Sequence, residues 1–213
     1  AFRLASQLST TASNVTDATA SFVQAGFTQS ESESLAKTSI TLQSISDNAM
    51  EMSDSTSFLT STLKSFNLTA GQGEHVINSI NEVSNKYALT SNDLTDNLGK
   101  VSGVANEAGV SFEQLLGLMT ASVEKTRNAS KSANAFKSIF INLQQMDASG
   151  TIPKLTKQFD EFGIKMTDQN GATKSAYDLL NELSVAYKKV SDSTDVEKQN
   201  KMKKLLEDIG GKY

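Results

Sequence analysis

The sequence has one histidine, His75, and no cysteine, so few side chains are suited to acid–base or nucleophilic chemistry. His75 follows Gly71-Gln72-Gly73 and falls in the first turn of an expected helix. A general base needs an orienting partner and a pocket, and no sequence feature near His75 indicates either. The glycine pair lacks the third glycine and the preceding strand of a dinucleotide-binding loop. We therefore interpret His75 as a surface residue near a helix start.

Two groups of acidic residues are the next candidates. Asp160 and Glu161 are adjacent in an expected helix, where neighbouring side chains do not face each other, so they do not match a glycosidase pair. Asp168-Gln169-Asn170-Gly171 loosely resembles a calcium loop, but Leu179 stands where an EF-hand needs a bidentate Glu. Turn formation explains Asp168 better than metal binding does.

Sequence motifs for other chemistry are missing as well. The chain contains no G-x-x-x-x-G-K-[ST] phosphate loop and no G-x-S-x-G nucleophile elbow. Without cysteine, and with one histidine, a metal site would have to rely on carboxylates alone. We therefore expect no catalytic, cofactor-binding or metal-binding residues, and no enzymatic activity.

The charge pattern does not favour nucleic acid as a partner. The formal net charge is −4, so there is no excess of positive charge to neutralise phosphates. Residues 1–99 carry four basic and ten acidic side chains, and the remainder carries sixteen and fourteen. The basic cluster Lys198, Lys201, Lys203 and Lys204 is interleaved with acids, as on a solvated helix. No apolar run approaches the roughly 18–20 residues of a membrane span, so we expect no membrane segment here.

Hydrophobic periodicity predicts a mainly α-helical protein. Pro153 is the only proline, which permits long helices. Apolar residues recur three or four positions apart in one segment after another, as in amphipathic helices. Examples are Val76-Ile80-Val83-Tyr87, Leu94-Leu98-Val101-Ala105-Ala108 and Leu179-Leu183-Ala186-Val190. We expect a multi-helix bundle or a semi-extended helical array.

One segment departs from the helical pattern. Residues 164–174 alternate around Asn170-Gly171, a strong signal for a two-residue hairpin turn because both residues tolerate positive φ. The pattern predicts one small β-hairpin, packed on Phe159 and Phe162. The predicted organisation is therefore a helical core region over 1–150, with about seven helices, and a region over 151–213 with a short helix, the hairpin and two helices.

Two helix joints resemble each other. Residues 22–31 and 104–113 each contain a helix end, Ala-Gly, an apolar residue, a hydroxyl residue and an acidic residue. Glycine suits the left-handed position after a helix, and the hydroxyl caps the next helix; Ser111 with Gln114 fits a capping box. The similarity indicates either a duplicated helix–turn–helix unit or two uses of a common joint. The separation of about 83 residues exceeds the usual solenoid periods of roughly 20–50.

An ordered set of short motifs extends over nearly the whole chain. In order they are Phe22-Val23-Gln24-Ala25-Gly26-Phe27-Thr28, Leu89-Thr90-Ser91-Asn92-Asp93-Leu94, residues 105–114, Phe162-Gly163-Ile164, Asp168-x-x-Gly171, residues 178–183 and Ile209-Gly210-Gly211. This order resembles the core region of phage tail tape-measure proteins of the lactococcal TP901-type family.

The resemblance implies a structural role in the virion. A tape-measure protein sets tail length and scaffolds tail assembly, so the resemblance implies a location in the tail lumen and, during assembly, in the host cytoplasm. It implies tail tube, baseplate and tail assembly chaperone proteins as partners, and it is compatible with self-association through helices. The family offers no catalytic residues to assign here.

A different class of protein also fits the helical pattern. The alternative is a helical interaction module of a bacterial secretion or signalling protein, although the stalks of such proteins keep their heptads unbroken for longer. Gly26, Gly109 and Asn170-Gly171 interrupt the heptads here. Because the chain starts at Ala1-Phe2-Arg3 within a helical pattern, we also expect it to be a piece of a longer protein.

Overall fold

The computed structural model describes residues 2–46, 50–87, 89–144 and 153–211, without the side chains of 153 and 154. Within these ranges the protein has 11 α-helices, one short 3-10 helix (η1) and no strand, and helix makes up 78% of the structure. The prediction of a mainly α protein is therefore confirmed.

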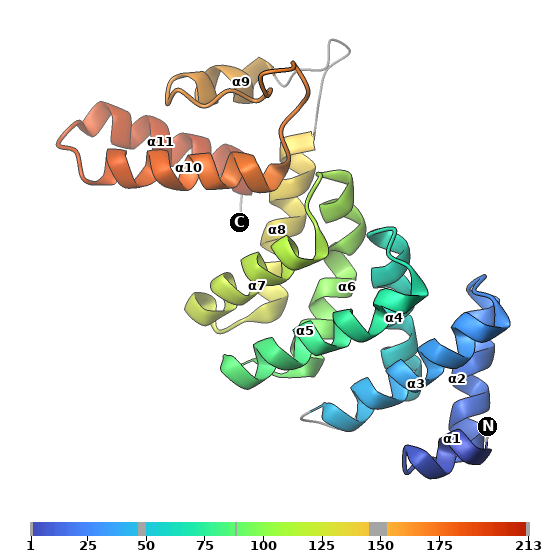
Figure 1. Cartoon of the computed structure of the whole chain (residues 1–213). Helices are drawn as coiled ribbons and strands as arrows, with labels where there is room; N and C mark the ends of the chain where they lie inside the picture. Colours follow the sequence, from blue (N-terminus) through green and yellow to red (C-terminus); the bar gives the residue numbers. More distant parts are fainter. Residues whose placement is uncertain (1, 47–49, 88, 145–152, 212–213) are drawn as a thin grey trace. The chain divides into compact units, whose positions relative to one another are not determined.

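Most of the described helices from α1 to α8 follow one another through short joints, whereas residues 161–175 separate α9 from α10 (Figure 1). In chain order they are α1 (Phe2–Gln7), α2 (Ala12–Gln24), α3 (Gln29–Ile45), α4 (Met52–Ser65), η1 (Ala70–Gln72), α5 (Gly73–Lys86), α6 (Ser91–Glu107), α7 (Phe112–Thr126), α8 (Ala129–Gln144), α9 (Pro153–Asp160), α10 (Ala176–Ser191) and α11 (Val196–Gly210). The predicted capping box at the start of α7 is confirmed. The Ser111 N–H donates to Gln114 Oε1 over 2.9 Å, and the Gln114 N–H donates to Ser111 Oγ over 3.2 Å.

The chain divides into two compact units. Unit 1 comprises Ala1–Gly103 and Leu115–Ala133, and unit 2 comprises Val104–Gln114 and Asn134–Tyr213. Each of α6, α7 and α8 therefore contributes residues to both units. The boundary predicted between residues 150 and 151 lies outside the described residues.

Unit 1 is built from helices that pack on their neighbours and on the helices two places away. Helix α2 contacts α3 and α4, and α3 contacts α4 and α5. In Figure 1, α2 and α4 form one layer and α3 and α5 a second one. Apolar side chains of these helices face this interior: Val15, Ala18 and Phe22 in α2, Leu35, Ile40 and Leu42 in α3, Leu59 and Leu63 in α4, and Val76, Ile77 and Ile80 in α5 are buried. Of the stripe expected in α5, Val76 and Ile80 are buried, Val83 is partly buried, and Tyr87 is 38% exposed.

Unit 2 contains a helical hairpin, α10–α11, with α9 packed on α11. Its core includes the buried side chains of Phe140, Phe159, Leu179, Leu183, Met202, Leu205 and Ile209. Two polar contacts join elements that are far apart in sequence. Asn142 Nδ2 donates to the Ile209 carbonyl over 2.8 Å, and Gln158 Nε2 donates to Asp208 Oδ2 over 2.8 Å.

The predicted β-hairpin at 164–174 is not supported. The described part of the chain has no strand, and this segment forms only one isolated antiparallel bridge, between Thr167 and Thr173. The physical reason is length. Ser175 already caps α10, so only residues 172–174 lie between Asn170-Gly171 and the cap, and this second arm is too short for a ladder.

Candidate functional site

Of the two glycines before His75, Gly73 packs against a neighbouring helix and Gly71 is exposed. His75 is exposed in the first turns of α5. Gly73 has ordinary helical angles, with φ −56° and ψ −40°, and is buried. A Cβ at this position would lie 2.9 Å from Leu35 Cδ2, so the small residue lets α5 approach α3. The geometry is a helix contact rather than a phosphate-binding loop.

The two acidic residues at the end of α9, Asp160 and Glu161, form ion pairs with different lysines. Asp160 Oδ1 lies 2.7 Å from Lys165 Nζ, and Glu161 Oε2 lies 3.5 Å from Lys201 Nζ. All four side chains are largely solvated, so each pair contributes little to stability. The two carboxylates therefore belong to two surface ion pairs.

Asp168 organises a turn. Its Oδ1 accepts hydrogen bonds from the backbone N–H groups of Asn170, over 2.8 Å, and Ala172, over 2.9 Å. Gly171 follows with φ +82°, a conformation that glycine adopts without strain. This is the turn chemistry that the sequence indicates at Asp168. No group of three or more His, Cys, Asp or Glu side chains that could hold a metal ion occurs among the described residues.

The lysine cluster of α11 is a solvated helix face. Lys201 Nζ lies 2.9 Å from Glu197 Oε1, one turn earlier, and 3.5 Å from Glu161 on the segment after α9. The hydrogen bond and the negative charge of Glu197, with a smaller effect of Glu161, raise the pKa of Lys201 above its ordinary value. The Lys201–Glu197 pair is an i,i+4 contact, as expected where lysines and acidic residues are interleaved on a solvated helix.

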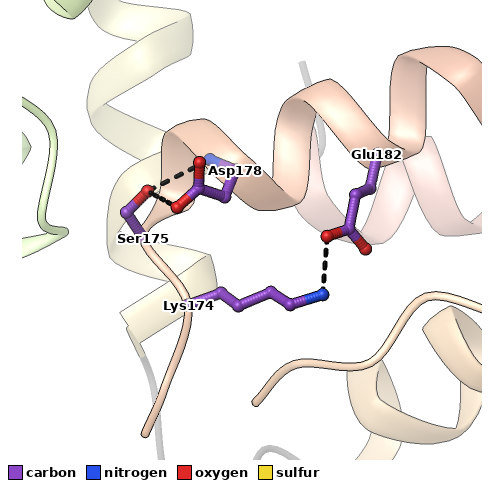
Figure 2. Close-up of polar contacts among 4 residues, drawn as sticks. All are labelled: Lys174, Ser175, Asp178 and Glu182. Atoms are coloured by element: carbon purple, nitrogen blue, oxygen red, sulfur yellow. Dashed lines mark hydrogen bonds and ion pairs between the residues drawn. The ribbon is translucent and has the colours of Figure 1, made fainter. Parts of the chain in front are cut away.

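In unit 2, four polar side chains contact one another in pairs at the start of α10: Lys174, Ser175, Asp178 and Glu182 (Figure 2). Ser175 is the N-cap: its Oγ accepts the Asp178 N–H over 3.1 Å and donates to Asp178 Oδ2 over 2.7 Å. Lys174 Nζ reaches Glu182 Oε1 over 2.6 Å. The Lys174 side chain is only 19% exposed, so this ion pair is shielded more than those of α9 and α11.

The same residues meet the end of α6, which we call the α6–α10 junction (Ala108, Gly109, Lys174, Ser175 and Ala176). The Ala176 N–H donates to the Ala108 carbonyl over 2.9 Å. Gly109 has φ +70°, and a Cβ there would lie 3.1 Å from Ser175 Cβ. A cleft of about 280 Å³ beside the junction is bordered by residues that include Leu143, Thr173 and Leu179. The backbone after α6 thus comes directly against the first turn of α10.

The chemistry of the α6–α10 junction is structural. The Ser175 hydroxyl donates to the Asp178 carboxylate and serves as a cap, and Lys174 is held by Glu182. Sequence reasoning missed this junction, although Ser175-x-x-Asp178 before an apolar stripe is a capping signal. The contact with Ala108 and Gly109 has no sequence signal, because it joins positions that are far apart along the chain.

Unit 1 has a groove of about 820 Å³ between α1, α2 and α3. Its lining combines the apolar Leu4, Val15 and Val23 with the charged Arg3, Glu33 and Lys37. Val23 is 44% exposed there. Self-association through helices stays a prediction. Along the chain that the structure describes, no helix is both long and apolar enough to cross a membrane.

The protein is mainly helical, and the polar residues of the sites described above cap helices, form turns or make ion pairs. The family model described as "Phage-related minor tail protein" matches residues 2–207. The chain therefore belongs to the phage-related minor tail protein family.

One relative of the chain has a more specific description than the family. Over 154 residues the chain is 23% identical to a protein of Escherichia phage P2 described as "Probable tape measure protein". The alignment covers 72% of this chain and 18% of the relative, so this chain spans about a fifth of that protein's length. No solved structure matches the chain.

Proposed function

We propose that this chain is a segment of a phage tail tape-measure protein of the TP901 type, which sets tail length and scaffolds tail assembly. In this proposal it occupies the tail lumen after assembly in the host cytoplasm, and it contacts tail tube, baseplate and assembly chaperone proteins. It acts through packing and length, without a catalytic step. The similarity to the phage P2 protein, over most of this chain, is the observation that carries the proposal.

The physics of the chain supports a ruler. Every residue of a helix adds the same rise, about 1.5 Å, so a helical chain converts residue number into length in a regular way. Helix makes up 78% of the described structure, and the one proline lies in the first turn of α9, where it breaks no helix. The alternative of a secretion or signalling module is disfavoured, because the tail-protein family match covers residues 2–207.

In-frame deletions in the phage that encodes the chain test the proposal. One variant lacks residues 27–67, and a second lacks residues 27–109, a deletion about twice as long. If this segment contributes to the measured length as helix, tails shorten in the ratio of the residues removed, by at most about 60 Å and about 125 Å. A phage with Glu31→Gln, which removes no residue, is the control and should keep the parental length. Electron microscopy of purified tails gives the measurement. Tails that assemble at parental length in both deletion variants contradict the length-setting role.

A further inference from the structure

Three of the helix joints share one backbone design. Gly26, Asn67 and Gly109 have φ values of +90°, +53° and +70°. At each of them the N–H donates to the carbonyl three residues earlier, and the next N–H donates to the carbonyl five residues before it. The second of these bonds measures 3.1, 2.8 and 2.9 Å in the three joints. This is the Schellman motif, which ends a helix and turns the chain in a fixed direction.

Each of the three joints continues into a capping box. The pairs are Thr28 with Glu31, Thr69 with Gln72, and Ser111 with Gln114. In every pair the backbone N–H of the hydroxyl residue donates to the side-chain oxygen of its partner over 2.9 Å, and the reciprocal bond is present. The shared pattern is a left-handed residue, an apolar residue, a hydroxyl cap, two further residues, and Glu or Gln.

The three joints are evenly spaced. Their left-handed residues are Gly26, Asn67 and Gly109, so almost the same length of chain separates one joint from the next. A helix lies on each side of every joint, which gives the pairs α2–α3, α4–α5 and α6–α7. Positions with the same offset are also buried alike: Ala18, Leu59 and Val101 are each 0% exposed, and Phe22, Leu63 and Ala105 are at most 1% exposed. A spacing of about 41 residues lies within the usual range for helical repeats.

Not every helix end has this design. Gly163 ends the turn after α9 with the same pair of backbone bonds, to Asp160 and Phe159. Lys165 then stands at the position of the hydroxyl cap, and the next helix starts only at Ala176. Among the described helix ends, the capped joint therefore distinguishes the sites at Gly26, Asn67 and Gly109 from the end of α9.

Burial along α2, α4 and α6 indicates that the helix pairs stack. Asn14 on α2 is only partly buried, whereas Ser55 on α4 and Asn97 on α6, at the same offset, are 0% and 4% exposed. Ser21 on α2 is exposed, and Thr62, its counterpart on α4, is fully buried. Helix α2 contacts α4, and α3 contacts α5. In a stack of helix pairs, an inner pair is covered by neighbours on both faces, whereas the first pair has a neighbouring pair on one face only, so polar residues of the first pair are more exposed than their counterparts.

We infer that residues 12–126 are three tandem copies of one helical hairpin, and that one whole copy is the step by which this segment lengthens or shortens and keeps its fold. In such an array each copy contacts its neighbours, so removing or adding one complete copy recreates the same kind of interface. The statement about the fold stands alone. Its meaning for tail length rests on the proposed function.

Deletions of two lengths in the otherwise complete chain test the repeat. Removing residues 27–67 joins Gly26 to Leu68 and keeps the capping box of Thr69 with Gln72. Removing residues 50–66 is the matched control, because this smaller deletion takes out α4 alone and leaves half a copy. Circular dichroism and urea unfolding are measured for both variants and for the parent chain.

The repeat predicts that the larger deletion is the better tolerated. The variant without 27–67 should keep the parental ellipticity per residue and the parental number of unfolding transitions. The slope of its free energy of unfolding against urea concentration, summed over all transitions, should be lower by about one fifth, in proportion to its length. The variant without 50–66 should lose ellipticity per residue and broaden its transition, because α2 and α3 lose their contacts with α4. Equal behaviour of the two variants, or a better fold after removal of 50–66, overturns the repeat.

A duplication variant tests the repeat without removing any native segment, so the test does not depend on whether a deletion variant folds. Inserting a second copy of residues 27–67 after Asn67 adds one complete step and removes no native segment. The urea dependence should rise by about one fifth with the ellipticity per residue unchanged. If neither the deletion of 27–67 nor this duplication gives the parental type of unfolding, the repeat is wrong. If both fold as expected while phage tails keep their length, the repeat stands and the ruler role fails.

Discussion

Gly109→Ala probes the close approach of residue 109 to Ser175 in the α6–α10 junction, and Gly26→Ala is its matched control. Both glycines lie in the left-handed region and end a helix with the same hydrogen bonds. A Cβ at residue 26 meets no described heavy atom within 4 Å, whereas a Cβ at residue 109 lies 3.1 Å from Ser175 Cβ. The two substitutions therefore share the conformational cost and differ in the steric one.

The expected magnitudes follow from these distances. A non-glycine residue in the left-handed region costs about 1–2 kcal/mol, partly offset by the lower entropy of alanine in the unfolded chain, so Gly26→Ala should cost about 1 kcal/mol. Carbon atoms pack best at about 3.5–4.0 Å, so a 3.1 Å contact with a residue fixed by its cap forces a shift. Overpacking adds about 1–3 kcal/mol, which brings Gly109→Ala to about 2–4 kcal/mol.

Urea titration of both variants measures the free energy of unfolding. Ser175→Gly in the Gly109→Ala background removes the clashing carbon while glycine still serves as an acceptable N-cap, so part of the loss should be recovered. Equal destabilisation at residues 26 and 109, or no recovery in the double variant, would refute the assigned contact.

Three further perturbations address the joints and the ion pair. Asn67→Gly should stabilise the chain by about 0.5 kcal/mol in urea unfolding, because glycine adopts φ +53° without a Cβ penalty; destabilisation would contradict this. Lys174→Met should cost about 1 kcal/mol by the same assay, and Glu182→Gln in that background should restore part of it if the shielded pair is intact in solution. Hydrogen bonds from Thr28 lower the pKa of Glu31, so its contribution is present above the ordinary carboxyl pKa and is lost as pH falls through the lowered value. Glu31→Gln should therefore lower stability slightly near pH 7 and reduce the loss of stability as pH falls below the ordinary carboxyl pKa; an equal acid loss in both proteins would count against the cap.

Helix positions could be predicted from the sequence because one-sided apolar stripes report the helical period directly. Val76 and Ile80 of one predicted stripe are buried in α5, although Tyr87 at its end is exposed, and Leu179, Leu183 and Val190 of another are buried in α10. The capping box of Ser111 and Gln114 was also predictable, since it depends on residues three apart. These signals are local, so no knowledge of the rest of the fold is needed.

The hairpin prediction failed because turn chemistry was taken as evidence for strands. Asp168 and Gly171 do form the turn, with Asp168 Oδ1 accepting two backbone N–H groups. A strand needs further backbone partners on both sides, and the cap at Ser175 ends the segment before they can form. The residues of a turn specify how the chain reverses, and they do not specify how long the pairing continues.

The α6–α10 junction lay beyond sequence reasoning for a different reason. Its contacts join Ala108 and Gly109 to Ser175 and Ala176, and each of these residues has a sufficient local explanation as part of a helix end or cap. Nothing in the local pattern shows that the two ends meet. A contact of this kind follows from packing of the whole unit, which no single sequence window contains.

The repeat is hard to find in the sequence because its middle joint has Asn67 where the other two joints have glycine. The joints at Gly26 and Gly109 are recognisable because glycine marks the left-handed position, and their separation alone exceeds a solenoid period. At the middle joint Asn67 takes the same conformation, since its side chain is among the few that tolerate positive φ. The backbone hydrogen bonds and the capping box fix the direction of the turn at Asn67. They do not depend on which apolar residue occupies a given buried position of the helices. The same offset can therefore hold Phe22, Leu63 or Ala105, and sequence identity between copies is lost while the even spacing of the joints is kept.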